Sequence, residues 1–284
     1  MSITTIATHN GAFHADEVMA CAILRRLYPD VKIFRTRDKA IYEQCDCVVD
    51  VGGEYDPDKN RFDHHQGGLD VTIDGSTPLS SVGMVYKKFW RKFLHSDDED
   101  LCQEFYNNLV REVDAIDNGT AGGSLISSNI SRVIAMMNGE HSQEHDEQMR
   151  RFTAAMNHAD YMMTIVLAAS KEALARFKQD YEKMRPIFDA HMESKEPYIV
   201  VETHAAAWFR CIDKYYRKSS RPEWVIYKEG DNWRIRTTSR SSKQLAPEDA
   251  IRAKVPDLVF AHKGRFIAET KTIESAKAIA ALSV

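Results

Sequence analysis

The sequence predicts an α/β protein: a parallel-sheet N-terminal domain with a helical extension, followed by a smaller α+β domain. Three observations predict this organisation. Strand and helix patterns alternate before residue 52, helical spacing dominates from about residue 79 to 191, and strand patterns return after Pro197. Such an alternation favours a parallel sheet with crossover helices. The composition shifts at residues 195–197, so we expect domains at residues 1–194 and 195–284.

The N-terminal elements follow from short apolar runs and from the residues that end them. We expect strands at residues 3–8, 31–35 and 47–51, and a helix at residues 15–27 that Pro29 stops. Ligands of parallel sheets bind at the carboxyl ends of the strands. His9, Asp50 and the triplet at residues 63–65 all stand where strands should end.

Later elements are read from helical spacing and from turn residues. Helices are expected at residues 79–94, from the acidic run at 97–100 to about 117, and, as two or more helices, from about 143 to 191. In the second domain we expect a strand at 198–202, hairpins at 224–237 and 258–268, and a closing helix at 273–282.

Composition excludes several classes of protein. Hydrophobic residues make up 43% of the 284 residues, enough for a sizeable core, so a metal here would be catalytic rather than structural. The five cysteines contain no C-x-x-C pair and are expected to be reduced thiols. The N-terminus lacks a signal-peptide pattern, and the longest apolar run, residues 161–169, is too short for a membrane span. We therefore expect a cytoplasmic protein without membrane contact, and the sequence leaves a homo-oligomer open.

Four clusters of possible metal ligands stand out. They are His9, His14 and Asp16; Asp50; Asp63, His64 and His65; and Asp114 with Asp117. Carboxylate and imidazole ligands without cysteine suit Mn²⁺, Fe²⁺, Co²⁺ or Zn²⁺ and argue against a closed structural zinc site. So many ligands fit two ions about 3.5–4 Å apart, the arrangement that promotes in-line displacement at phosphorus. Each cluster alone is explained equally well as a helix cap, a first-turn acid or a surface histidine. Only the order and spacing of the clusters along the chain favour a metal site.

This order resembles the DHH phosphoesterase superfamily, which is named for the triplet found here at residues 63–65. The strings HNGAFHADE, VVDVGGEYDP, RFDHHQ, VDAIDNG and FAHKGRFIAE look like landmarks of the Myg (melanocyte proliferating gene) exonuclease family. The resemblance runs from residue 4 nearly to the C-terminus, and its N-terminal motifs are the more specific ones.

The resemblance implies roles for these residues. His9, His14 and Asp50 would hold one metal ion, and the other would be held by Asp16, Asp50, His64 and Asp117, with Asp114 as the competitor of Asp117. His65 would face the substrate phosphate, and Asp63 would orient a histidine. Mn²⁺ is the expected ion, with Mg²⁺, Co²⁺ and Zn²⁺ as alternatives.

Two positions depart from the family pattern. Most superfamily members have an aspartate where this chain has His14, and the chain has Ala268 and Glu269 in place of a Gly-Gly pair that approaches substrate. The first departure bears on metal preference, and the second puts the substrate class in question.

The segment from Arg210 to Lys243 is basic and rich in aromatic residues. It has ten Lys or Arg against four Asp or Glu. This composition suits single-stranded nucleic acid, and it equally suits a half-buried sheet with solvated charges on its outer face. The candidate substrate-binding residues in the second domain are Arg236, Arg240, His262 and Arg265.

We therefore expect a metal-dependent phosphoesterase that hydrolyses phosphodiester bonds without a covalent enzyme intermediate. The resemblance implies a 3′–5′ exonuclease on single-stranded RNA or a short oligonucleotide. One alternative is a hydrolase of a small phosphate ester or related molecule, such as pyrophosphate, a nucleoside bisphosphate or a very short oligonucleotide. Another is a non-catalytic binding protein on a hydrolase fold.

Overall fold

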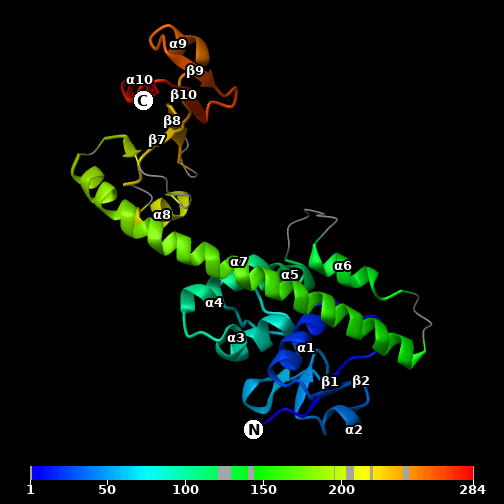
Figure 1. Cartoon of the computed structure of the whole chain (residues 1–284). Coiled ribbons are helices and arrows are strands. Elements are labelled where there is room, and N and C mark those ends of the chain that lie inside the picture. The colour runs from blue at the N-terminus through cyan, green and yellow to red at the C-terminus, as the bar shows by residue number, and fades with distance from the viewer. Residues whose placement is uncertain are drawn as a thin grey trace. The chain divides into compact units, whose positions relative to one another are not determined.

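The computed structural model describes residues 2–120, 129–139, 144–194, 196–202, 208–217, 220–238 and 243–283 (Figure 1). The chain divides into two compact units, Met1–Glu172 and Ala173–Val284. This division falls within the long helix α7 (His145–Ser194). The domain boundary expected near residue 195 assigns the whole of that helix to the first domain, and it stays a prediction.

The first unit is built on a five-stranded sheet, as the α/β prediction requires. Its strands, in spatial order, are β2 (Lys32–Arg35), β1 (Thr5–Thr8), β3 (Cys47–Val49), β5 (Arg61–Phe62) and β4 (Tyr55–Asp56). The first four run parallel, and β4 is an antiparallel edge strand. The three long apolar runs were recognisable in the sequence, whereas β4 and β5 have only two residues each and leave no periodic signal.

Helices complete the first unit. They are α1 (Ala15–Leu27), α2 (Lys39–Tyr42), the 3-10 helix η1 (Pro57–Lys59), α3 (Ser81–Leu94), α4 (Glu99–Phe105), the π-helix η2 (Tyr106–Val110), α5 (Arg111–Asp117) and α6 (Ile130–Met136). Helix α1 packs beside α3 (Figure 1), and every residue from Ala15 to Leu24 is buried. This burial places the first turn of α1 in the interior, next to the strand ends. The polar residues of that turn therefore need partners there.

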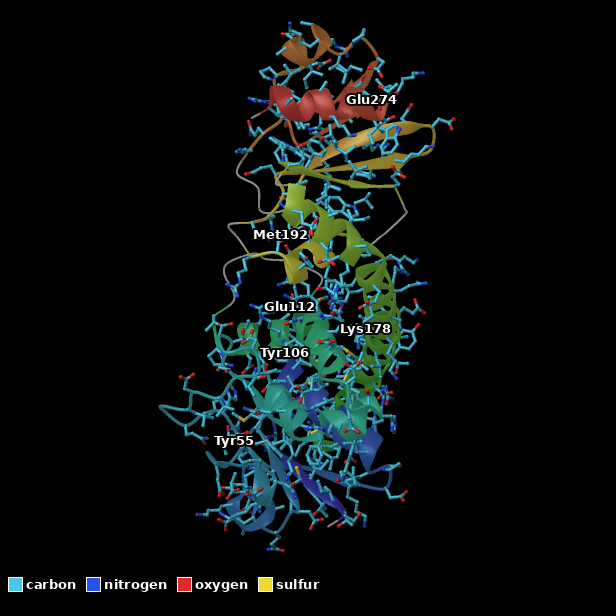
Figure 2. All side chains as sticks on the ribbon, turned by 90° about the vertical axis from the view of Figure 1, so that its left-hand side faces the viewer. Tyr55, Tyr106, Glu112, Lys178, Met192 and Glu274 are labelled. Atoms are coloured by element: carbon cyan, nitrogen blue, oxygen red, sulfur yellow. The ribbon has the colours of Figure 1, made fainter. Side chains whose placement is uncertain are left out.

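The segment expected to be one helix up to residue 117 contains a π-helical turn. Tyr106, labelled in Figure 2, begins this turn and is fully buried, with its ring stacked 6.4 Å from that of Tyr86. A π-turn shifts the helical phase of the residues that follow it. The sequence pattern does not show which face α5 presents after such a shift.

Helix α7 corrects one expectation. The sequence suggested two or more helices from about 143 to 191, but a single helix runs from His145 to Ser194 and includes Pro186. Buried residues recur at intervals of one to four from Phe152 to Met163 and again from Ser170 to Phe188, so the helix is packed over two stretches, and the second contains Pro186. This tertiary packing offsets the loss of a backbone hydrogen bond at the proline.

The second unit is a mixed sheet covered on one face by a helix. Its strands, in spatial order, are β6 (Tyr198–Val201), β7 (Trp224–Glu229), β8 (Asn232–Thr237), β10 (Ile267–Thr270) and β9 (Leu258–Ala261). Only β6 and β7 are parallel, and both expected hairpins are present. Among its described residues, the unit is completed by the part of α7 after Glu172 and by α8 (Trp208–Tyr215), α9 (Glu248–Arg252) and α10 (Ile273–Leu282).

Helix α10 packs on β7, β8 and β10, and its first turn carries Glu274, labelled in Figure 2. The core beneath it includes Ile226, Ile235 and Ala268. Within the described part of the chain, no helix combines the length and apolar character needed to cross a membrane.

Candidate metal centre

Three adjacent parallel strands deliver the predicted ligands to one edge of the first sheet. His9 directly follows β1, Asp50 follows β3, and the triplet at 63–65 follows β5. Asp50 has a φ of 57°, a left-handed conformation that costs a non-glycine residue about 1–3 kcal/mol. A backbone hydrogen bond to Phe62 (3.0 Å) and the hydroxyl of Ser81, which donates to Asp50 Oδ1 (3.0 Å), hold it there.

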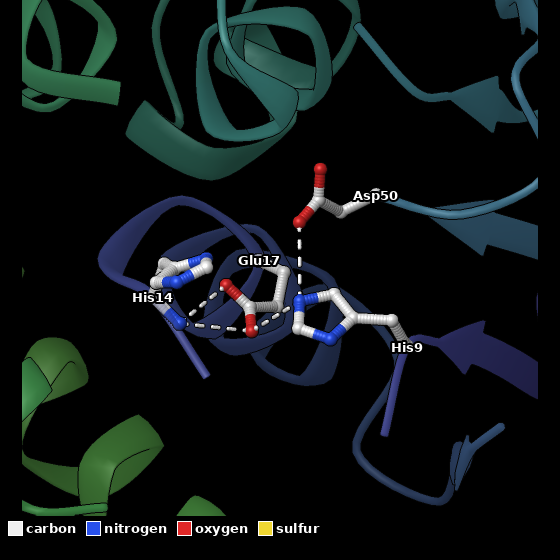
Figure 3. Close-up of side chains that lie close together, drawn as sticks. All are labelled: His9, His14, Glu17 and Asp50. Atoms are coloured by element: carbon white, nitrogen blue, oxygen red, sulfur yellow. Dashed lines mark hydrogen bonds and ion pairs between the residues drawn. The ribbon is translucent and has the colours of Figure 1, made fainter. Parts of the chain in front are cut away.

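The start of α1 supplies a second group of side chains, shown in Figure 3. His14 is the N-cap residue, and the carboxylate of Glu17 accepts its backbone N–H at 2.9 and 3.0 Å. Glu17 is fully buried, and its Oε1 lies 2.9 Å from His9 Nε2. His9 Nε2 also lies 3.3 Å from Asp50 Oδ2. Glu17 therefore joins the cluster, although it is not among the ligands expected from the sequence.

His64 lies at the centre of the remaining ligands. Its Nε2 is 2.9 Å from Asp117 Oδ2, 3.5 Å from Asp50 Oδ1 and 3.9 Å from Asp16 Oδ2. Three sets of possible ligand atoms each lie within 4.8 Å of one another: His9, His14, Glu17 and Asp50; Asp50, His64 and His65; and His14, Asp16 and Asp117. Because Asp50 and His14 each belong to two sets, the sets form one continuous cluster.

The histidine tautomers suit metal coordination. His9 Nδ1 lies 3.0 Å from the carbonyl oxygen of Asn10, and His64 Nδ1 lies 3.4 Å from Asn118 Oδ1. Asn118 donates through Nδ2 to two carbonyl groups, which leaves Oδ1 as an acceptor. Each Nδ1 therefore carries a proton, and in the neutral ring each Nε2 presents a lone pair to the carboxylates.

Asp16 is the strongest sign that a cation belongs here. Its side chain is buried, and neither carboxylate oxygen has a hydrogen-bond partner in the described part of the chain. Burial and the neighbouring carboxylates of Asp50, Glu17 and Asp117 raise the pKa of Asp16 well above its ordinary value. Burying an unpartnered carboxylate is costly, so an ion that binds these oxygens would remove a large unfavourable contribution.

The imidazoles of His9 and His64 place positive charge beside these acids. Burial tends to lower the pKa of His9, but its hydrogen bonds to Asp50 and Glu17 outweigh this and raise that pKa to about 10. The pKa of His64 rises to about 11, because bonds to Asp117 and Asp50 outweigh burial. For Asp50, burial acts to raise the pKa, and the contacts with His64 and His9 nevertheless hold it below its usual range.

Asp63 and His65 form a hydrogen-bonded pair beside the cluster. Asp63 Oδ1 lies 2.8 Å from His65 Nδ1 and accepts the backbone N–H of His65, while its Oδ2 accepts the N–H of Gly53. The side chain of His65 is 64% exposed, although its Nδ1 is only 3.4 Å from Asp50 Oδ1. Since a carboxylate can only accept, Nδ1 of His65 is the protonated nitrogen and Nε2 is directed away from Asp63.

The two acids expected in the fourth cluster have different surroundings. Asp117 joins the cluster through His64, whereas Asp114 accepts hydrogen bonds from Ser80, from N–H at 3.0 Å and from Oγ at 2.7 Å. Asp114, on α5, is fully buried against Ser80 at the start of α3, and burial raises its pKa to about 7. A Cβ on Gly83 would lie 2.4 Å from Asp114 Oδ2, so only glycine fits there.

Two residues outside the cluster hold the loop that carries His9 and His14. Arg35, at the end of β2, donates from Nε to the carbonyl of His9 (3.2 Å) and from Nη2 to that of Gly11 (2.8 Å). Asn138 pairs with the backbone of Phe13 through both its amide oxygen and its amide nitrogen, each at 2.7 Å. Neither residue carries a sequence signal, because both act on backbone atoms distant in sequence.

The candidate residues of the second unit are only partly described. Arg240 lies outside the described residues. The guanidinium of Arg236 lies over the rings of Phe209 (4.7 Å) and Phe266 (5.8 Å), and Arg265 Nε donates to the carbonyl of Leu245 (2.6 Å). His262 is exposed in the turn between β9 and β10.

Ala268 and Glu269, which replace the expected Gly-Gly pair, are both accommodated in β10. Ala268 is buried in the core. Glu269 is bound by Arg234 (2.7 Å) and Asn232 (2.6 Å), so its charge is compensated.

Comparison with known proteins gives consistent matches along the chain. The family model MYG1_exonuc, described as "Uncharacterised protein family (UPF0160)", matches residues 5–284. The MYG1 exonuclease of Bos taurus is 39% identical over 181 residues, which cover 55% of this chain and 48% of that protein. The MYG1 protein of Schizosaccharomyces pombe is 29% identical over 97% of this chain and 95% of its own length.

The chain thus spans about half the length of the mammalian relatives it matches. Among solved structures, RecJ from Thermus thermophilus in complex with Mn²⁺ aligns over 98% of this chain and 52% of that chain, at 15% identity and a TM-score of 0.32. A similarity this low establishes neither a shared mechanism nor a shared metal ion.

Proposed function

The chain belongs to the MYG1_exonuc family, and on that premise we propose that it is a metal-dependent phosphoesterase, acting as a 3′–5′ exonuclease on RNA. The observation that carries the proposal is Asp16, a buried carboxylate that has no hydrogen-bond partner among the described residues and lies beside three other acids and four histidines. A purely structural cluster would pair such a group with donors of its own chain. A cation site explains why the described residues supply no donor to Asp16.

The residues present fit two divalent ions. His9, His14 and Asp50 would hold one, and Asp16, Asp50, His64 and Asp117 the other, with Asp50 shared between them. Glu17 reaches His9 and the backbone of His14, so it either orients these ligands or joins the first set. When bound, a pair of divalent ions lowers the pKa of a water molecule and neutralises charge on phosphoryl oxygens. Mn²⁺ is the ion we expect, because mixed carboxylate and imidazole ligands suit it.

The other residues of the site orient the ligands and the substrate. Asp63 fixes His65 as the Nδ1-protonated tautomer, and His65 is exposed beside the cluster. When its Nε2 is also protonated, it can donate to a phosphate oxygen. Asn118 and the carbonyl of Asn10 hold His64 and His9 with Nε2 toward the acids. These contacts hold the imidazoles in place before an ion or a substrate binds.

The two alternatives are weighed by the same features. A decayed, non-catalytic protein would not be expected to keep Asp16 buried without a hydrogen-bond donor among the described residues. A hydrolase of small phosphate esters remains the competing proposal, because nothing in the cluster itself selects a long substrate. The free, buried cysteines suit a reducing compartment such as the cytoplasm.

The first experiment is a hydrolysis screen with Mn²⁺, Mg²⁺, Co²⁺ or Zn²⁺ supplied in turn. Substrates are RNA and DNA strands labelled at either end, pyrophosphate, a nucleoside bisphosphate and bis(p-nitrophenyl) phosphate. We expect stepwise shortening of RNA from its 3′ end with Mn²⁺. Cleavage of pyrophosphate or the bisphosphate alone would replace the exonuclease by the small-molecule hydrolase.

A matched set of variants tests the ligands. Asp16→Ala, Asp50→Ala and His64→Ala should each abolish turnover, whereas His65→Ala should keep its metal stoichiometry and lose turnover. Asp117→Asn should lose bound metal, and Asp114→Asn, one helical turn away, should retain it. Near-normal turnover of any ligand variant at saturating Mn²⁺ would show that the two-ion assignment is wrong.

A further inference from the structure

The sheet of the second unit has one face covered by α10 and another that carries aromatic and basic side chains. Side chains alternate between the faces along each strand. Ala268 and Ile235 point to the covered face, so their neighbours Glu269, Arg234 and Arg236 point to the other. Phe260 is paired with Glu269 across β9 and β10 and lies on that second face.

Rings and a guanidinium follow one another across this second face. Successive ring centroids are 6.2 Å apart from Phe260 to His262, 4.3 Å from His262 to Phe266, and 3.5 Å from Phe209 to Trp208. The guanidinium of Arg236 joins the two groups, 5.8 Å from the Phe266 ring and 4.7 Å from the Phe209 ring. We call this set the aromatic band: Phe260, His262, Phe266, Arg236, Phe209 and Trp208.

The turn between β9 and β10 holds its part of the band rigidly. The N–H of Gly264 donates to His262 Nδ1 (2.9 Å), and the N–H of Arg265 donates to the carbonyl of His262 (2.7 Å). A Cβ on Gly264 would lie 3.0 Å from His262 Nδ1 and 3.3 Å from Phe266 Cδ1. Glycine therefore lets the two rings approach closely, and the band is organised before any ligand binds.

The band is exposed at its β9–β10 end, at Phe260, His262 and Phe266, whereas Arg236, Phe209 and Trp208 are half-buried. Phe260 is 46% exposed and Phe266 is 37% exposed, although the core of this unit is closed without them. Contiguous exposed aromatic groups mark a binding surface. The guanidinium within the band, with Lys263 in the adjacent turn, favours an anionic ligand. Glu269 on the same face opposes such a ligand little, because Arg234 and Asn232 bind its carboxylate.

We propose that the aromatic band stacks the unpaired bases of a single-stranded nucleic acid, with Arg236 beside the strand's phosphates or bases. The proposal rests on the proposed function and narrows its substrate to strands several nucleotides long. Aromatic rings stack on any base, so binding should tolerate different sequences. Removing one stacked ring should weaken binding about tenfold, the fold-change that typical stacking contributions give.

The test measures binding of the full chain to a fluorescent RNA strand of about ten nucleotides, a typical site size. EDTA prevents hydrolysis, and an abasic strand with the same number of phosphates serves as the comparison ligand. The variants are Phe260→Ala, Phe260→Leu and Gly264→Ala. The control is Phe34→Ala, a phenylalanine of β2 with a similar exposure of 42%.

We expect both Phe260 variants to bind the RNA about tenfold more weakly and the abasic strand as the wild type does. Phe260→Leu separates ring stacking from apolar burial, and Gly264→Ala should weaken binding by separating the rings. Equal affinity of the wild type for both strands would overturn the proposal. The proposal would also be overturned if the wild type dimerises while Phe260→Ala is monomeric and binds RNA with unchanged affinity, because the band would then be a contact between two copies of the chain.

Hydrolysis of bis(p-nitrophenyl) phosphate with Mn²⁺ separates this proposal from the function on which it rests. If the wild type cleaves this small diester but binds strands independently of the rings, the role of the aromatic band is refuted and the phosphoesterase activity is not. A wild type that binds strands through the rings but cleaves no phosphodiester refutes the proposed activity and leaves the band as a binding surface.

Discussion

Replacing Asp16 by asparagine should stabilise the protein without metal and remove its response to metal. Among the described residues, neither buried carboxylate oxygen of Asp16 has a hydrogen-bond partner, and burial together with three other carboxylates raises its pKa. Asparagine keeps the shape and removes the charge. The penalty for one unsatisfied buried polar group is about 1–3 kcal/mol, and more for a charge. The asparagine amide can donate to the neighbouring carboxylates, so the penalty of the charge is removed and the melting temperature in EDTA should rise by about 2–10 °C for a unit of this size.

The metal-dependent part of the same experiment has the opposite sign. An ion present at about 100 times its Kd stabilises the protein that binds it by about 2.7 kcal/mol. Wild type should therefore melt at a higher temperature with Mn²⁺ than in EDTA, and Asp16→Asn should show little difference. Differential scanning fluorimetry with and without Mn²⁺ measures both effects.

A matched control uses an aspartate that is well bonded. Asp74 accepts hydrogen bonds from Ser76 and Thr77 and pairs with Arg111 at 2.9 Å. Asp74→Asn should lower the melting temperature and leave the gain with Mn²⁺ unchanged. The proposal that Asp16 binds a cation would be refuted if Asp16→Asn melts at a lower temperature than wild type in EDTA. It would also be refuted if Mn²⁺ raises the melting temperature of this variant as much as that of wild type.

Two further predictions concern residues around the cluster. Arg35→Met should weaken Mn²⁺ binding about tenfold in calorimetry, since Arg35 holds the carbonyls of His9 and Gly11 and the loss of such support typically has this effect. The control Arg26→Met removes a half-buried arginine that bonds to Asp160 instead and should bind Mn²⁺ as the wild type does, and equal affinities of Arg35→Met and wild type would exclude a positioning role. The buried carboxyl of Asp114 has its pKa raised to about 7 from an unfolded value near 4, so folded protein binds a proton that the unfolded chain has released between these pH values. The contribution of the Asp114 carboxyl group to the free energy of unfolding is thus fully present below pH 4. It is lost as the pH rises through 7, and the loss is up to about 4 kcal/mol. Asp114→Asn should remove that dependence, so its free energy of unfolding, measured by urea denaturation in EDTA, should rise relative to that of wild type from pH 4 to 7. If the two free energies change in parallel with pH, the raised pKa of Asp114 is contradicted.

The sequence determined the parts of this protein that depend on local pattern. Each apolar run that ends in His9 or Asp50 predicts a strand with a ligand at its carboxyl end. Parallel strands place such ends at one edge of a sheet, so the order of the elements already predicted that these candidate ligands gather at one edge of the first unit's sheet. The hairpins were equally readable, because their apolar runs flank turn residues such as Gly230 and Gly264.

Only the tertiary structure decided between residues with the same local pattern. Asp114 and Asp117 lie one helical turn apart, and the docking of α3 directs Asp114 to Ser80 and leaves Asp117 to His64. The π-turn η2 just before α5 sets that rotation, and it has no sequence period. Glu17 is the same kind of case, since a first-turn acid becomes a partner of His9 only when α1 is buried along its length. Local pattern fixes what kind of element forms, but a rotation of a fraction of a turn, fixed by packing, decides which side chain enters the site.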